Sequence, residues 1–138
     1  MEVFLGGTCA DSTWREELIP QLEIDYFNPV VDDWKPEDQE IELEKRESCD
    51  IILYVITPLM EGVYSIAEVV DDSNKRPDKT IFCILDEDIK YQFKREWTKA
   101  QRKSLKAVEK MVAKNGGLVV EFDDIADVCN VIGEMEEE

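Results

Sequence analysis

The chain has 138 residues, of which 43% are hydrophobic and 36% are charged, so it is long enough for one globular domain with a substantial core. Its 16 basic and 33 acidic residues give a formal net charge of −17, which disfavours binding to nucleic acid or to an anionic membrane surface. The absence of histidine excludes Ser-His and Cys-His nucleophile systems and histidine-ligated metal sites.

The first half of the chain alternates short apolar runs with amphipathic segments. Residues 3–5 are apolar and precede two glycines, which predicts a strand that ends in a tight loop. Apolar residues at helical spacing over 14–22 predict a helix, and 24–27 predict a second strand. A proline followed by two acids predicts a charged helix over 36–47.

The second half continues this alternation. The β-branched run 51–56 predicts a central parallel strand, which is buried on both faces. A helix is predicted over 66–73 and a buried strand over 80–85. The charged and aromatic stretch 86–97 is longer than a usual connection, so it could be a lid or an exposed loop.

The last part of the chain predicts two further helices and one strand. Thr98 and Gln101 have the spacing of a capping box, which predicts the start of a helix that ends at a glycine pair. Residues 118–120 predict a strand, and 125–132 predict an amphipathic helix that runs into a Glu-rich tail.

Five strands that alternate with five helices predict an α/β fold, a five-stranded parallel sheet with helices on both faces and the flavodoxin-like order 2-1-3-4-5. Residues 1–133 form a single domain in this interpretation, and 134–138 form an acidic tail. In such sheets ligands bind beyond the carboxyl ends of the strands, where the strand order reverses. The loops 6–12, 28–34 and 58–68 should therefore converge on one site.

The loop 58–68 has two interpretations. Ser65 and Glu68 lie three apart at a predicted helix start, which fits a capping box in which Glu68 turns back to the backbone. In the alternative, Glu68 points into the cleft, where the helix N-terminus keeps it ionised for attack or for binding a cationic group. One orientation of this carboxylate cannot serve both roles.

The other two loops are equally open to a structural or a functional interpretation. Gly6-Gly7-Thr8 could bring backbone amides to a ligand or form only a tight turn, and matches neither a dinucleotide-binding fingerprint nor a P-loop. Asn28 could form a turn or hydrogen-bond a sugar or base. Asp33 and Trp34 could be a solvated acidic loop with a packed aromatic, or a carboxylate and a flat ring suited to a nucleobase.

Other conspicuous residues are expected to be structural. Asp71 and Asp72 lie one or two turns inside their helix and are expected to face solvent, as are the acids within 37–47, whereas Trp14 is expected in the core. No carboxylate spacing resembles a calcium loop, so neither a metal nor a cofactor is expected.

The cysteines and the start of the chain bear on the compartment. The four cysteines lie far apart without a C-x-x-C pair, which predicts reduced thiols in a cytoplasmic protein. No signal peptide is expected, and no apolar run approaches the length of a membrane span.

Four segments occur in a fixed order within about the first 85 residues: Val3-Phe4-Leu5-Gly6-Gly7-Thr8 with Trp14, Phe27-Asn28-Pro29 with Trp34, Cys49-Asp50-Ile51-Ile52-Leu53, and Gly62-Val63-Tyr64-Ser65-Ile66-Ala67-Glu68. In this order and spacing they resemble the nucleoside 2-deoxyribosyltransferase-like proteins. The resemblance implies a retaining, two-step transfer of a 2-deoxyribosyl group between nucleobases through a covalent glutamyl-deoxyribosyl intermediate.

The resemblance also implies roles for individual residues. Glu68 matches the family's nucleophile, which attacks C1′ as the base departs and needs no histidine. Glu61 matches an acidic position that assists the leaving base, and Asp33 matches an acid that contacts the base. Tyr64 or Ser65 could hydrogen-bond the nucleophile or the sugar hydroxyls.

The implied partners are a deoxynucleoside and a nucleobase, and the implied assembly is a homo-oligomer. Two alternatives stay open: hydrolysis of the N-glycosidic bond of deoxynucleosides or their 5′-monophosphates, and a non-catalytic module that binds a nucleotide-like ligand. Few basic residues lie near the first loop, which favours nucleosides over nucleotides as ligands.

Overall fold

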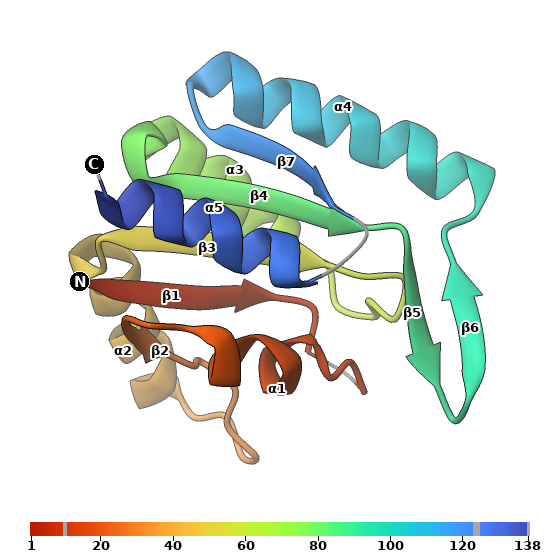
Figure 1. Ribbon diagram of the computed structural model, residues 1–138, viewed down its shortest axis with the longest axis horizontal. Coiled ribbons are helices and arrows are strands. Elements are labelled where there is room, and N and C mark those ends of the chain that lie inside the picture. Colours follow the sequence, from red (N-terminus) through yellow and green to blue (C-terminus); the bar gives the residue numbers. More distant parts are fainter. Residues whose placement is uncertain (10, 123–124, 138) are drawn as a thin grey trace.

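The computed structural model describes residues 1–9, 11–122 and 125–137, which form an α/β fold around a five-stranded parallel sheet (Figure 1). The sheet has the strand order β2-β1-β3-β4-β7, which confirms the predicted flavodoxin-like order. Its strands are β1 (Glu2–Gly7), β2 (Asp25–Phe27), β3 (Ile51–Ile56), β4 (Thr80–Leu85) and β7 (Leu118–Phe122).

Helices cover both faces of this sheet, as predicted. They are α1 (Trp14–Leu18), α2 (Pro36–Ser48), α3 (Tyr64–Lys75), α4 (Lys99–Asn115) and α5 (Ile125–Glu137). Alternate residues of β3 point to opposite faces, so that Leu53 packs in the core with α1 and α5, and Ile52 packs in the core with α3 and α4. Figure 1 shows α5 in front of the sheet and α3 behind it.

The central strand is buried throughout, as its β-branched sequence predicts. All six residues of β3 are at most 1% exposed, and Trp14 is also buried in the core, as expected. The capping box at the start of α4 is confirmed as well, because the Thr98 hydroxyl accepts from the backbone N–H of Gln101 and the Gln101 side chain accepts from that of Thr98.

Two predicted segments differ from the structure. The helix expected over 14–22 is α-helical only to Leu18 and continues as a 3-10 turn over Ile19–Gln21, because Pro20 has no N–H to continue the α-helical hydrogen bonding. The stretch 86–97 is an antiparallel hairpin of β5 (Glu87–Lys90) and β6 (Phe93–Glu96). Its turn residues Tyr91 and Gln92 both have positive φ, at 52° and 67°.

The last helix extends further than its predicted range, 125–132. Helix α5 continues through Glu137, so the acidic segment after residue 133 is helical as far as the structure describes it. None of the helices within the described residues is both long and apolar enough to cross a membrane.

Candidate functional site

The first loop is fixed by close approach to the central strand. A Cβ on Gly6 would lie 2.6 Å from the ring of Tyr54. Gly7 has a φ of +121°, and a Cβ there would lie 2.0 Å from the carbonyl oxygen of Val55. Both positions therefore require glycine, because β1 and β3 pair closely here and the backbone turns through the left-handed region.

Thr8 ties the carboxyl ends of β1 and β3 together. Its N–H donates to the carbonyl of Val55 at 2.9 Å, and its hydroxyl oxygen accepts from the N–H of Thr57 at 2.9 Å. Its carbonyl accepts from the Trp14 indole at 2.8 Å and from the buried guanidinium of Arg15 at 2.7 Å. These four hydrogen bonds fix Thr8 at the carboxyl edge of the sheet, where the strand order reverses.

A pocket of about 260 Å³ lies at this edge, between the first loop and the start of α3. It brings together six of the predicted site residues; the pocket is lined by Gly7, Thr8, Cys9, Met60, Glu61, Gly62, Tyr64, Ser65 and Glu68. Gly6 precedes Gly7 in β1 and does not line the pocket. Two of the three predicted loops therefore converge as expected.

The capping-box interpretation of Ser65 and Glu68 is wrong. Helix α3 begins at Tyr64 with Val63 as its N-cap, and no side chain makes a cap hydrogen bond. Ser65 lies within the first turn, so it cannot cap the helix. The Glu68 carboxylate instead forms an ion pair with Arg46 of α2, with 3.6 Å between Nη1 and Oε2.

Burial controls the charge of Glu68. Its side chain is only 13% exposed, and this burial raises its pKa to about 7, an effect that Arg46 partly opposes and that Glu42, Asp72 and Asp71 reinforce. This burial acts against the expectation that the helix N-terminus keeps Glu68 ionised. At neutral pH the side chain is divided between its ionised and protonated forms.

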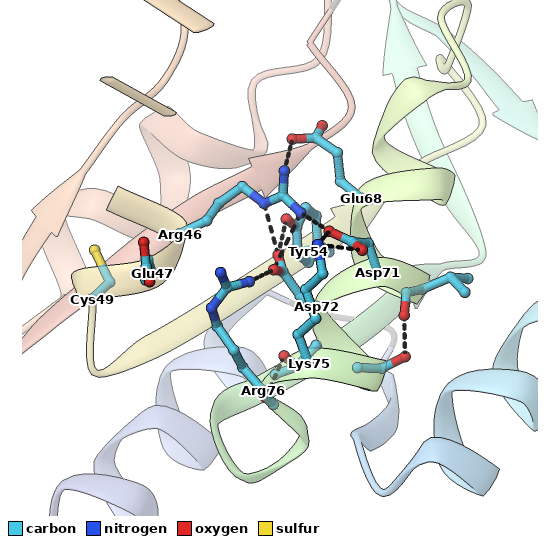
Figure 2. A network of polar contacts seen from close by, with 12 residues as sticks. Arg46, Glu47, Cys49, Tyr54, Glu68, Asp71, Asp72, Lys75 and Arg76 are labelled. Carbon is cyan, nitrogen blue, oxygen red and sulfur yellow. Dashed lines mark hydrogen bonds and ion pairs between the residues drawn. The ribbon is translucent and has the colours of Figure 1, made fainter. Parts of the chain in front are cut away.

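Arg46 links Glu68 to a buried polar network (Figure 2). Its Nε donates to Asp72 at 2.9 Å, and its Nη2 donates to Asp71 at 2.9 Å. The Tyr54 hydroxyl donates to Asp72 at 2.5 Å, and Arg76 Nη1 donates to the other oxygen of Asp72 at 2.5 Å. Burial and the neighbouring charge of Asp72 raise the pKa of Tyr54, so this phenol stays a donor.

This network corrects the prediction that Asp71 and Asp72 both face solvent. Asp71 is partly exposed, but Asp72 is fully buried, because it lies three residues after Val69 on the face of α3 that packs against the sheet. One sequence signal indicates such a partner: Tyr54 interrupts an aliphatic strand, and a buried phenol needs a hydrogen-bond acceptor.

The second loop does not reach the pocket. The Asn28 side chain accepts from the N–H of Val30 at 3.1 Å, which is a turn arrangement. Asp33 and Trp34 are exposed, and none of these three predicted residues lines the 260 Å³ pocket. Their roles toward a ligand stay predictions.

The β5–β6 hairpin lies beyond the carboxyl ends of β1 and β4 (Figure 1), and the pocket residues Gly7, Thr8 and Cys9 also lie at the carboxyl end of β1. The Ser12 hydroxyl donates to Asp88 at 2.6 Å, and Lys90 forms an ion pair with Asp11 at 2.8 Å. These two contacts join strand β5 to the first loop. The Trp97 indole donates to the carbonyl of Leu85 at 2.8 Å and fixes the base of the hairpin.

Two further observations concern metal-binding clusters and a second groove. Among residues 1–9, 11–122 and 125–137, no group of three or more Cys, Asp or Glu side chains is placed to hold a metal ion. A second, apolar groove of about 1010 Å³ lies between α3 and α4, on a face of α3 different from that of Glu68. The pocket with an acidic, partly ionised side chain is therefore the better candidate for carboxylate chemistry.

Comparison with known proteins identifies a family for the first part of the chain. A family model described as nucleoside 2-deoxyribosyltransferase like matches residues 1–88, a range that includes the whole pocket. No curated protein matches the chain by sequence.

Proposed function

Because this chain belongs to the nucleoside 2-deoxyribosyltransferase-like family, we propose that it transfers the 2-deoxyribosyl group of a deoxynucleoside from one nucleobase to another. The observation that carries the proposal is the position of Glu68. This carboxylate lines a pocket at the carboxyl edge of the central strand, where the fold places ligands, and its pKa of about 7 leaves a large ionised fraction at neutral pH.

The proposed reaction has two displacements at the same carbon. In the first, an oxygen of Glu68 forms a bond to C1′ while the bond from C1′ to the base nitrogen breaks, and its electron pair leaves with the base, which takes up a proton. In the second, a nitrogen of the incoming base attacks C1′, loses a proton and releases the carboxylate. Two inversions give overall retention.

Other pocket residues assist in this proposal. Glu61 assists the departure of the base, and Tyr64 and Ser65 hydrogen-bond the sugar or the nucleophile. Gly7 and Thr8 form the wall opposite, and Gly6 precedes them in β1. Asn28, Asp33 and Trp34 lie outside the residues that line the pocket, and we propose that they contact the base when substrate is bound.

The charges at the pocket support nucleosides over nucleotides as substrates. Glu61 and Glu68 line it, whereas Arg46 is occupied by three carboxylates and Lys90 by Asp11. Because no lysine or arginine is among the described residues that line the pocket, a 5′-phosphate would meet net negative charge there, and we expect the 5′-monophosphate to be the poorer substrate.

Hydrolysis of the same bond is the second candidate. Tyr64 is 62% exposed and Glu61 is also exposed, so the pocket rim leaves the ester within reach of water. A single assay separates the candidates: deoxyinosine or thymidine is mixed with a different free base, and base release and new nucleoside are both measured. Exchange supports transfer, release without exchange supports hydrolysis, and neither product contradicts both.

The pKa of Glu68 predicts the pH dependence of this activity. Since the nucleophile must be ionised, kcat/KM should rise with pH up to about pH 7 and level off above it. At pH 5 we expect about a 100-fold reduction, because only about one carboxylate in a hundred is then ionised. Initial rates measured from pH 5 to pH 9, with circular dichroism to verify folding at each pH, give the profile. A rate that stays constant down to pH 5 contradicts this assignment.

A further inference from the structure

We propose that Arg46 is a positioning residue for this reaction, which holds Oε2 of Glu68 through Nη1 and so directs Oε1 toward C1′ of the sugar. The inference rests on the proposed function for the role of Glu68, but the contact on which it depends exists without substrate. Arg46 itself lies on α2, outside the residues that line the pocket.

The guanidinium of Arg46 is held in a fixed direction. Two of its nitrogens bind carboxylates of α3, Nε to Asp72 at 2.9 Å and Nη2 to Asp71 at 2.9 Å. The side chain is 5% exposed, so water does not compete strongly for these contacts. Because the guanidinium is planar, binding two of its edges fixes where the third points, and Nη1 faces Glu68 (Figure 2).

Asp72 fixes the position of Arg46 because Asp72 is itself held by other contacts. It is fully buried and also binds the Tyr54 hydroxyl of β3 and the guanidinium of Arg76. Arg46 therefore cannot follow Glu68 if that side chain turns. The Glu68 carboxylate forms its ion pair with this guanidinium at 3.6 Å.

Within this cluster the charge of Arg46 favours the ionised form of Glu68, whereas the charges of Asp71 and Asp72 oppose it. The ion pairs connect three cations with three carboxylates, so the group is electrically balanced when Glu68 is ionised; they are Arg46, Lys75 and Arg76 with Glu68, Asp71 and Asp72. Other ionisable groups also face Glu68. Glu42 of α2 acts against its ionisation, Tyr54 of β3 lies beneath it, and Cys9, Glu61 and Tyr64 share its pocket.

Two substitutions separate the charge of Arg46 from its geometry. Arg46→Met removes the cation and keeps much of the side chain's bulk, so the pKa of Glu68 should rise by about one unit or more. The ascending limb of the rate profile should move to higher pH by the same amount, and kcat/KM at pH 7 should fall about fivefold or more, because the ionised fraction of Glu68 falls from about one half to about one tenth or less. Arg46→Lys keeps the charge but cannot bind three carboxylates with fixed directions, so kcat should fall while KM and the pH profile change little.

The pKa of Glu68 is best measured directly, by NMR of protein labelled with ¹³C at the Glu side-chain carboxyl, with the Glu68→Gln spectrum assigning the signal. Arg76→Met is the matched control, since it removes a second guanidinium from Asp72 without touching Glu68 and should leave this pKa nearly unchanged. The NMR titration needs no turnover. A shift in Arg46→Met therefore supports the interaction of Arg46 with Glu68 even if the base-exchange assay fails, and that assay alone tests the proposed function.

An unchanged Glu68 pKa in folded Arg46→Met, or the same shift in Arg76→Met, overturns the inference. If Arg46→Met does not fold, the kcat and KM of Arg46→Lys test the inference. Wild-type kcat in that variant overturns the inference, and a lowered kcat at unchanged KM supports it.

Discussion

Replacing Glu68 by Gln is expected to lower base exchange at pH 8 by at least about 1,000-fold, because the amide cannot act as the nucleophile that forms the ester. Glutamine has nearly the shape of glutamate, so the pocket and α3 should be retained. The rate of new nucleoside formation measures the effect, and circular dichroism and thermal unfolding measure the fold.

Glu47→Gln is the matched control for this experiment. Glu47 is an exposed residue of α2 outside the pocket, and the same change there should leave the rate within about twofold of the wild type. A folded Glu68→Gln protein that exchanges bases at a rate within tenfold of the wild type would assign the nucleophile to another group.

The second large effect is expected on stability. Asp72→Ala should lower the free energy of unfolding by about 3–5 kcal/mol, because it leaves the buried Arg46 guanidinium and the Tyr54 hydroxyl without their acceptor. This is a large part of the 5–15 kcal/mol typical of a domain. Urea unfolding followed by circular dichroism gives the value.

The neighbouring Asp71 supplies the comparison. It also binds Arg46, but its side chain is 42% exposed, so Asp71→Asn should cost less than about 1 kcal/mol. Equal losses in the two variants would show that the burial of Asp72 is not what stabilises the network.

The fold could be predicted from the sequence because its elements have strong local patterns. The β-branched run 51–56 can be satisfied only by burial on both faces, and that requirement fixes the parallel sheet. The β5–β6 hairpin was not predicted, because its turn residues Tyr91 and Gln92 are not the Asn-Gly or Asp-Gly pairs that usually indicate such a turn. The positive φ values of this turn have no local sequence signal.

The candidate site was predictable only in part. The loop that follows β3 could be located from the topology, and the resemblance identified Glu68 within it. Arg46 could not be found in this way, because on a helix rich in acids its charge indicates a solvated surface. Its burial depends on partners 22 to 26 residues away on α3, and such pairing is determined by packing rather than by local spacing.

The most direct test of the account identifies the residue that carries the sugar during turnover. The protein is mixed with deoxynucleoside without an acceptor base, quenched in acid, and analysed by intact mass and by peptide mapping, with Glu68→Gln in parallel. The account predicts a gain of one deoxyribosyl group on the peptide that contains Glu68, at that side chain, and no gain in the variant. A deoxyribosyl group on another side chain, or base exchange that proceeds while no residue becomes labelled, would contradict it.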